Sequence, residues 1–124
     1  MDKETSIEEL QALIKEFAQR RDWEIFHSPK NLSMAISAET AELMEHFLWC
    51  DSEESHRILK NPKQKQEIAS ELADILMYSL QFANQTGIPL AKAIKQKLKN
   101  NETRFPVDQY KGVSSKKFKK LEES

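Results

Sequence analysis

The chain has 124 residues, of which 39% are hydrophobic and 31% are charged, and its formal net charge is −1. This length fits one compact domain, and the nearly balanced charge gives no electrostatic case for a nucleic-acid partner. With 2 Gly and 4 Pro, the chain is too poor in turn residues for an all-β fold, and it cannot form a glycine-rich phosphate loop.

The first predicted helix begins after Ser6. Ser6 and Glu9 have the spacing of a capping box, and apolar residues follow at helical intervals to about Trp23. Pro29 marks a break in the chain, after which we predict a second helix over residues 30–50.

A short surface helix and a long third helix are predicted next. The short helix runs from Asp51 to about Leu59. Asn61 is a good N-cap for the third helix because a proline, Pro62, occupies the first helical position. We predict that this helix continues to about residue 86, with Gly87 as the residue that ends it.

A fourth helix is predicted over residues 90–103, before Pro106. We therefore expect an all-α fold with a four-helix, bundle-like protomer. The domain should cover residues 1–110, followed by a flexible basic tail over residues 111–124. The lysines of this tail are Lys116, Lys117, Lys119 and Lys120.

Two acidic pairs distinguish the second and third predicted helices. Glu39 and Glu42 form one pair, and Glu71 and Asp74 form the other. Residues three apart lie on the same face of a helix, so each pair presents two carboxylates together. A single pair of this kind is usually an ordinary surface feature, but two pairs on neighbouring helices are much rarer.

The surroundings of the acidic pairs favour a metal site. No Lys or Arg occurs in residues 31–50 or 66–85, and both helices are apolar nearly all round, so we expect them to be mostly buried. Buried carboxylates are unfavourable unless a cation lies beside them. Oxygen ligands favour Mg²⁺, with Mn²⁺ as a possible substitute, and Mg²⁺ commonly completes its shell with substrate phosphates. The pattern predicts a metal site for a phosphorylated substrate, in which Glu39 or Glu42 could also accept a proton from water.

Several segments, in matching order and spacing, resemble the MazG-like all-α nucleoside triphosphate pyrophosphohydrolases, and among them the dCTP pyrophosphatase branch. The resemblance covers about residues 5–110. The segments that carry it are Arg21-Asp22-Trp23, Phe26-His27, Asn31-Leu32, residues 38–43, residues 47–49, residues 71–78, and Lys97 to Asn101 with Arg104-Phe105-Pro106.

The resemblance implies hydrolysis of a nucleoside triphosphate between its α and β phosphates, giving a nucleoside monophosphate and pyrophosphate. It also implies self-association into a dimer or a dimer of dimers. The implied Mg²⁺ ligands are Glu39, Glu42, Glu71 and Asp74. The residues implied to bind substrate are Trp23, Trp49 and Tyr78 around the base, and Lys97, Asn101 and Arg104 near the phosphates or sugar.

One departure concerns the base pocket. Ile14 stands where the animal dCTP enzymes carry a histidine, so strict cytosine selection is not expected. We expect deoxynucleoside triphosphates to be preferred, with dCTP among the better substrates.

Other features have simpler interpretations. His46 falls on the acidic stripe, where it could support the site, although a hydrogen-bonded packing role is expected. Cys50 is expected to be inert. The pair Glu53 and His56 has di-iron spacing but no second copy, which makes a ferritin-like protein a weak alternative. A non-catalytic helical interaction module is the main alternative to the enzyme. The polar N-terminus, the lone cysteine and the absence of a long apolar run predict a cytoplasmic protein without a membrane partner.

Overall fold

A computed structural model describes residues 4–113, which form two compact units divided between Ile88 and Pro89. The described residues form helices and no strands, so the predicted all-α fold is confirmed. None of the helices in residues 4–113 combines the length and the apolar character needed to cross a membrane. The predicted tail over residues 111–124 lies almost entirely outside the described residues.

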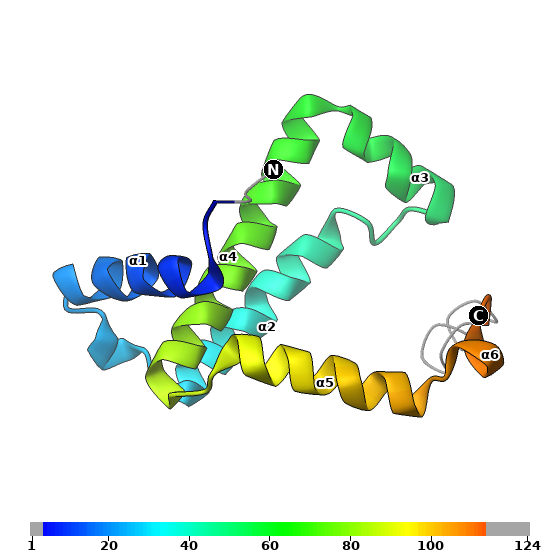
Figure 1. The fold of residues 1–124 in the computed structure, drawn as a ribbon. Coiled ribbons are helices and arrows are strands. Elements are labelled where there is room, and N and C mark those ends of the chain that lie inside the picture. Colours follow the sequence, from blue (N-terminus) through cyan, green and yellow to red (C-terminus); the bar gives the residue numbers. More distant parts are fainter. Residues whose placement is uncertain (1–3, 114–124) are drawn as a thin grey trace. The chain divides into compact units, whose positions relative to one another are not determined.

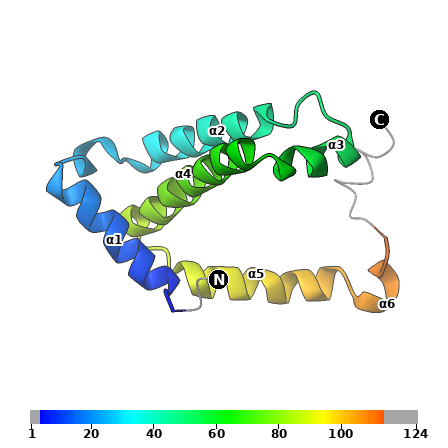
Figure 2. The ribbon, with the colours of Figure 1, turned by 90° about the horizontal axis from the view of Figure 1, so that it is seen from above.

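The centre of the first unit is an antiparallel pair of helices, α2 (Pro29–Glu45) and α4 (Pro62–Thr86) (Figures 1 and 2). Side-chain contacts show the direction of pairing. His27, just before α2, contacts Gln81 near the end of α4, whereas His46, just after α2, contacts Glu71 near the middle of α4. The two acid-bearing helices are therefore direct neighbours.

Helix α1 (Ile7–Arg20) packs against α4 in the same unit (Figure 1). Ser6 caps its first turn by accepting a hydrogen bond from the backbone amide of Glu9, as predicted. The helix ends at Arg20, three residues before the predicted end, because Asp22 adopts a left-handed conformation with φ of 53°. Its successor Trp23 then donates its amide to the carbonyl of Ala18, which closes the turn.

The connection between α2 and α4 follows the prediction closely. It contains α3 (Ser52–Arg57) and the 3₁₀ helix η2 (Ile58–Lys60), and Asp51 accepts the cap hydrogen bond from Glu54. Asn61 caps α4, and Gly87 ends it with φ of 70°. A second 3₁₀ helix, η1 (Glu24–Phe26), joins α1 to α2.

Two expectations about the acid-bearing helices are wrong. Helix α2 ends at Glu45 rather than near Cys50, because residues 46–49 form turns. The helices are also less buried than predicted, because within one chain α2 packs mainly against α4, and α4 mainly against α2 and α1, so the other sides of both helices stay uncovered. Leu32 is the only buried residue of α2, and Met34 and Leu72 remain 60% and 48% exposed.

The second unit contains α5 (Leu90–Arg104) and the short helix α6 (Val107–Tyr110). Helix α5 is the predicted fourth helix, whereas α6 was not predicted from the sequence. The rings of Phe105 and Tyr110 meet edge to face, with centroids 5.1 Å apart, and this contact holds α6 against the end of α5.

Candidate active site

The four predicted acidic ligands lie close enough to influence one another across the α2–α4 pair. The pKa of Glu39 is raised above its ordinary value of 4.5, first by burial and then by the carboxylate of Glu42. The charges of Asp74 and Glu71, on the neighbouring helix, raise it further. The spacing within each helix and the packing of the two helices thus bring both acidic pairs together.

Two oxygen atoms in this acidic cluster are buried without a hydrogen-bond partner. They are the Oε2 atoms of Glu39 and Glu71. The Nε2 atom of His46 lies 2.7 Å from Oε2 of Glu71, but the two atoms are not aligned for a hydrogen bond, so the contact is electrostatic only if the imidazole is protonated. His46 therefore lies against the cluster itself, rather than serving only in packing.

The cluster suits a hard divalent cation in its chemistry. Its ligand atoms are carboxylate oxygens, and the orphaned oxygens of Glu39 and Glu71 have unused lone pairs. Among residues 4–113, no three His, Cys, Asp or Glu side chains converge on a single point as a closed cage would require. Mg²⁺ needs no such cage, because it is usually held by one or two carboxylates together with substrate phosphates and water.

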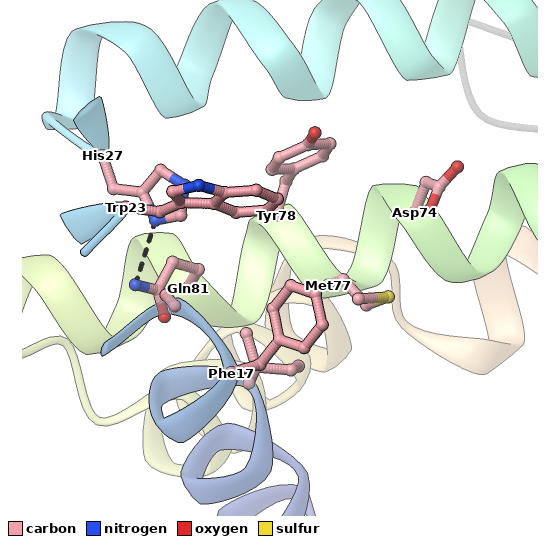
Figure 3. Close-up of a pocket in the computed structure, with 9 residues that line it drawn as sticks. Phe17, Trp23, His27, Asp74, Met77, Tyr78 and Gln81 are labelled. Carbon is pink, nitrogen blue, oxygen red and sulfur yellow. Dashed lines mark hydrogen bonds between the residues drawn. The ribbon is translucent and has the colours of Figure 1, made fainter. Parts of the chain in front are cut away.

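A cavity of about 160 Å³ adjoins the acidic cluster in the first unit (Figure 3). Aromatic and aliphatic side chains form most of its wall, and Asp74 also lines it. Its lining residues are Ile14, Phe17, Ala18, Trp23, His27, Asp74, Met77, Tyr78 and Gln81. Because Asp74 belongs to both features, the apolar cavity opens beside the carboxylates.

The aromatic part of the wall is held together by contacts between neighbouring elements. Phe17 and Trp23 meet edge to face with ring centroids 5.7 Å apart, and the Arg21 guanidinium lies 3.7 Å from the centre of the Phe17 ring. In Figure 3, Asp74 lies at the opposite end of the cavity from His27. Asp74 and Gln81, the partner of His27, are seven residues apart on α4, which corresponds to about 10 Å along the helix axis.

The structure brings some of the predicted base-contacting residues to this cavity and not others. Trp23 and Tyr78 line it, and so does Ile14, the departure noted in the sequence. Trp49 does not line it and is 90% exposed, because α2 ends before reaching it. A role for Trp49 in binding substrate stays a prediction.

Five residues of the cavity were given no role in the site from the sequence: Phe17, Ala18, His27, Met77 and Gln81. Phe17 belongs to the apolar stripe of α1, so its helical spacing marked it as a core residue. His27 and Gln81 are 54 residues apart and are paired only by the fold. Gln81 shares its helix face with the polar residues Asn84 and Gln85, and this polar stretch was the available signal.

Lys97, Asn101 and Arg104 lie on α5, in the second unit. Their spacing of four and then three residues places all three on one face of that helix. This arrangement is compatible with a shared anionic ligand. Their part in binding substrate stays a prediction.

An all-α fold with carboxylates on two adjacent helices is the architecture of a known family, and the chain belongs to it. Residues 34–121 match the model of the MazG-like family. The predicted family is therefore confirmed, together with the fold class.

Particular relatives share most of the chain. It is 36% identical over 113 residues to dCTP pyrophosphatase 1 of Bos taurus, covering 91% of this chain and 67% of the relative. The protein of the same name from Homo sapiens is 34% identical over 118 residues, covering 95% of this chain and 69% of the relative. This chain thus spans about two thirds of these relatives. A crystal structure of a pyrophosphatase from Archaeoglobus fulgidus superposes with a TM-score of 0.76 and 36% identity, over 86% of this chain and 97% of that one.

Proposed function

We propose that the chain is an enzyme of the nucleotide pyrophosphatase class and that it hydrolyses deoxynucleoside triphosphates between the α and β phosphates. The products are a nucleoside monophosphate and pyrophosphate. One observation carries the proposal: the apolar, aromatic cavity shares Asp74 with the cluster of carboxylates. A nucleotide has the same division, with a flat apolar base at one end and phosphates at the other.

The acidic cluster would bind the phosphate end through Mg²⁺, for which Mn²⁺ could substitute. The proposed ligands are drawn from Glu39, Glu42, Glu71 and Asp74, and substrate phosphates and water would complete the coordination shell. Bound there, the cation would neutralise phosphate charge and favour departure of pyrophosphate. The buried Oε2 atom of Glu39 supports this assignment, because a carboxylate oxygen buried without a donor is rare unless it binds a ligand.

The protein's own groups would then handle the water molecule. Water supplies the hydroxyl group that bonds to phosphorus while the bond to the pyrophosphate oxygen breaks, and one proton must be removed from the water. Glu39 or Glu42 is the proposed acceptor, and the raised pKa of Glu39 makes its carboxylate a stronger base than an ordinary glutamate carboxylate. Lys97, Asn101 and Arg104 are proposed to bind the phosphates or sugar.

The aromatic cavity would hold the base. The indole of Trp23 and the ring of Tyr78 offer stacking surface, and stacking tolerates any base because every base has a π-face. Ile14 adds apolar surface without a hydrogen-bonding group. We therefore propose that dCTP is among the better substrates without being the only one.

The test is an assay of product release from the four dNTPs and the four NTPs. With Mg²⁺ we expect release of equal amounts of monophosphate and pyrophosphate, at a higher rate from deoxynucleotides than from ribonucleotides. With a chelator in place of Mg²⁺ we expect neither product. Release of inorganic phosphate in place of pyrophosphate would contradict the proposed bond cleavage. Absence of turnover on all eight substrates would favour the second candidate, a non-catalytic interaction module built on the exposed apolar residues of α2 and α4.

A further inference from the structure

A chain of side-chain amides connects α1 to the base end of the cavity. It begins at Gln11 on α1, passes through Asn84 and Gln81 on α4, and ends at the imidazole of His27. Gln81 is 1% exposed, so its amide has no water to replace these partners. Figure 3 shows the last link of the chain, between Gln81 and His27.

The direction of every hydrogen bond in this chain follows from one backbone group. Asn84 lies 3.0 Å from the carbonyl oxygen of Gln11, which can only accept, so the atom facing it must be the Asn84 nitrogen. The same nitrogen donates to Oε1 of Gln81 at 3.0 Å, while Oδ1 of Asn84 accepts from the Gln11 side chain at 3.2 Å. The nitrogen of Gln81 is therefore left facing His27.

The imidazole must respond to that donor. Nε2 of Gln81 lies 3.2 Å from Nδ1 of His27. A proton on Nδ1 would face the N–H group of Gln81, so Nδ1 accepts and the ring proton resides on Nε2. With Nδ1 occupied by Gln81, the polar group that His27 can still offer is the Nε2–H donor. His27 lines the cavity, so a ligand bound there could meet this donor.

We propose that His27 is a specificity-determining residue, which offers its Nε2–H group to a hydrogen-bond acceptor of the bound base, and that Gln81, Asn84 and Gln11 are positioning residues that fix this tautomer. The inference rests on the proposed function, since it takes the occupant of the cavity to be a nucleobase. The expected ligand group is a carbonyl oxygen or an unprotonated ring nitrogen. An exocyclic amino group at that position would face another donor and be rejected.

The tautomer can be tested on the free protein by two-bond ¹H–¹⁵N correlation spectra of its three histidines. His27 is assigned from the signal lost in His27→Phe. We expect the Nε2–H form in the parent. In Gln81→Glu, the new carboxylate can accept from both Asn84 and the imidazole, so Nδ1 should become protonated. Gln66→Glu, the same change at an exposed site on α4, should leave the spectrum of His27 unchanged.

A parent His27 that carries its proton on Nδ1 alone would overturn the proposal. So would a Gln81→Glu variant, folded by its circular dichroism, in which His27 keeps the tautomer of the parent. Asn84→Asp provides a second variant outside the cavity wall. It removes the donor to Gln81, and the resulting reversal of that amide should also move the ring proton to Nδ1.

The effect on base choice is measured by calorimetric binding of the four α,β-imido deoxynucleoside triphosphates with Mg²⁺. For the base preferred by the parent, His27→Phe should weaken binding about tenfold, as loss of one hydrogen bond predicts. Gln81→Glu should change the ranking of the four bases, and Gln66→Glu should keep it. An unchanged ranking in Gln81→Glu, with the tautomer reversed, would overturn the role of His27. Because these analogues are not cleaved, failure of the proposed hydrolysis would appear separately, in the product assay.

Discussion

At the residue scale, Glu39 occupies the most unusual electrostatic environment in the first unit. It is half-buried, one of its oxygens has no hydrogen-bond partner, and three other carboxylates act on it. A carboxylate in such a position is electrostatically unfavourable unless it binds a ligand. Its effect can be measured in both activity and stability.

The first prediction concerns activity. Glu39→Gln and Glu71→Gln should each lower kcat/KM by about a hundredfold or more, because each removes a carboxylate proposed to hold the Mg²⁺ ion that neutralises the phosphates. Steady-state pyrophosphate release at saturating Mg²⁺ provides the measurement. Glu45→Gln is the matched control, an exposed glutamate on the same helix. If both variants kept the rate of the control, the assignment of the ligands would be wrong.

The second prediction concerns pH and stability without divalent cations. The folded protein holds the pKa of Glu39 above 4.5, so it favours the protonated form more than the unfolded chain does. The contribution of Glu39 to stability is therefore full below pH 4.5 and is lost as pH rises through the folded pKa. Urea unfolding across this range should show Glu39→Gln gaining stability relative to the parent as pH rises. A difference between the two proteins that stays constant with pH would refute this.

The sequence predicted these acids but not the polar end of the cavity, for a physical reason. Each acidic pair lies within one helical turn, so its geometry follows from local spacing. The link between Gln81 and His27 spans 54 residues and depends on how α4 meets the turn before α2. No local pattern encodes such a contact.

At the scale of elements, the ends of helices were predictable where the sequence itself has a capping residue or a helix-terminating residue at that position. Helix α4 begins after Asn61 and ends at Gly87, as expected. The end of α1 was not predictable, because apolar spacing continues to Trp23 whereas the helix stops at the left-handed Asp22. That turn carries Trp23 to the cavity wall, so the misplaced boundary falls at a feature that positions the site.

The third prediction tests the end of α4. Gly87 has φ of 70°, and a Cβ atom placed there would meet nothing within 4 Å, so a substitution should alter only backbone strain. Gly87→Ala should lower the free energy of unfolding by about 1 kcal/mol, and Gly87→Asn by less, since asparagine tolerates this conformation better. Urea denaturation of the two variants beside the parent decides it, and equal losses would contradict the conformational explanation.

At the scale of the whole molecule, one chain leaves much apolar surface on its acid-bearing helices and the turn after α2. The exposed large residues there are Met34, Met44, Leu48, Trp49, Leu72, Leu76 and Met77. Burial within one chain was overpredicted because an apolar pattern indicates that a residue is covered, but not whether its own chain or a second chain covers it. Surface of this kind is unusual on a protein that stays monomeric.

The fourth prediction is that the protein self-associates. Sedimentation velocity at micromolar concentration should give a dimer or a larger assembly. Leu76→Glu, which places a charge on a side chain that is 53% exposed, should shift the population towards monomer. Gln66→Glu adds the same charge at a polar site and should not. A parent that sediments as a folded monomer would refute the prediction.

The attachment of α1 has a consequence for how substrate enters. Ala18 is its only buried residue, and its side-chain hydrogen bonds to α4 are those between Gln11 and Asn84. Such a helix should open locally at a lower free energy than the paired α2 and α4. We expect amide hydrogen exchange to be faster in α1 than in the middle of α4, and bound nucleotide to slow it. Because Ile14 and Phe17 leave with α1, each opening would remove one wall of the cavity, and the base could enter from the side before the helix closes over it.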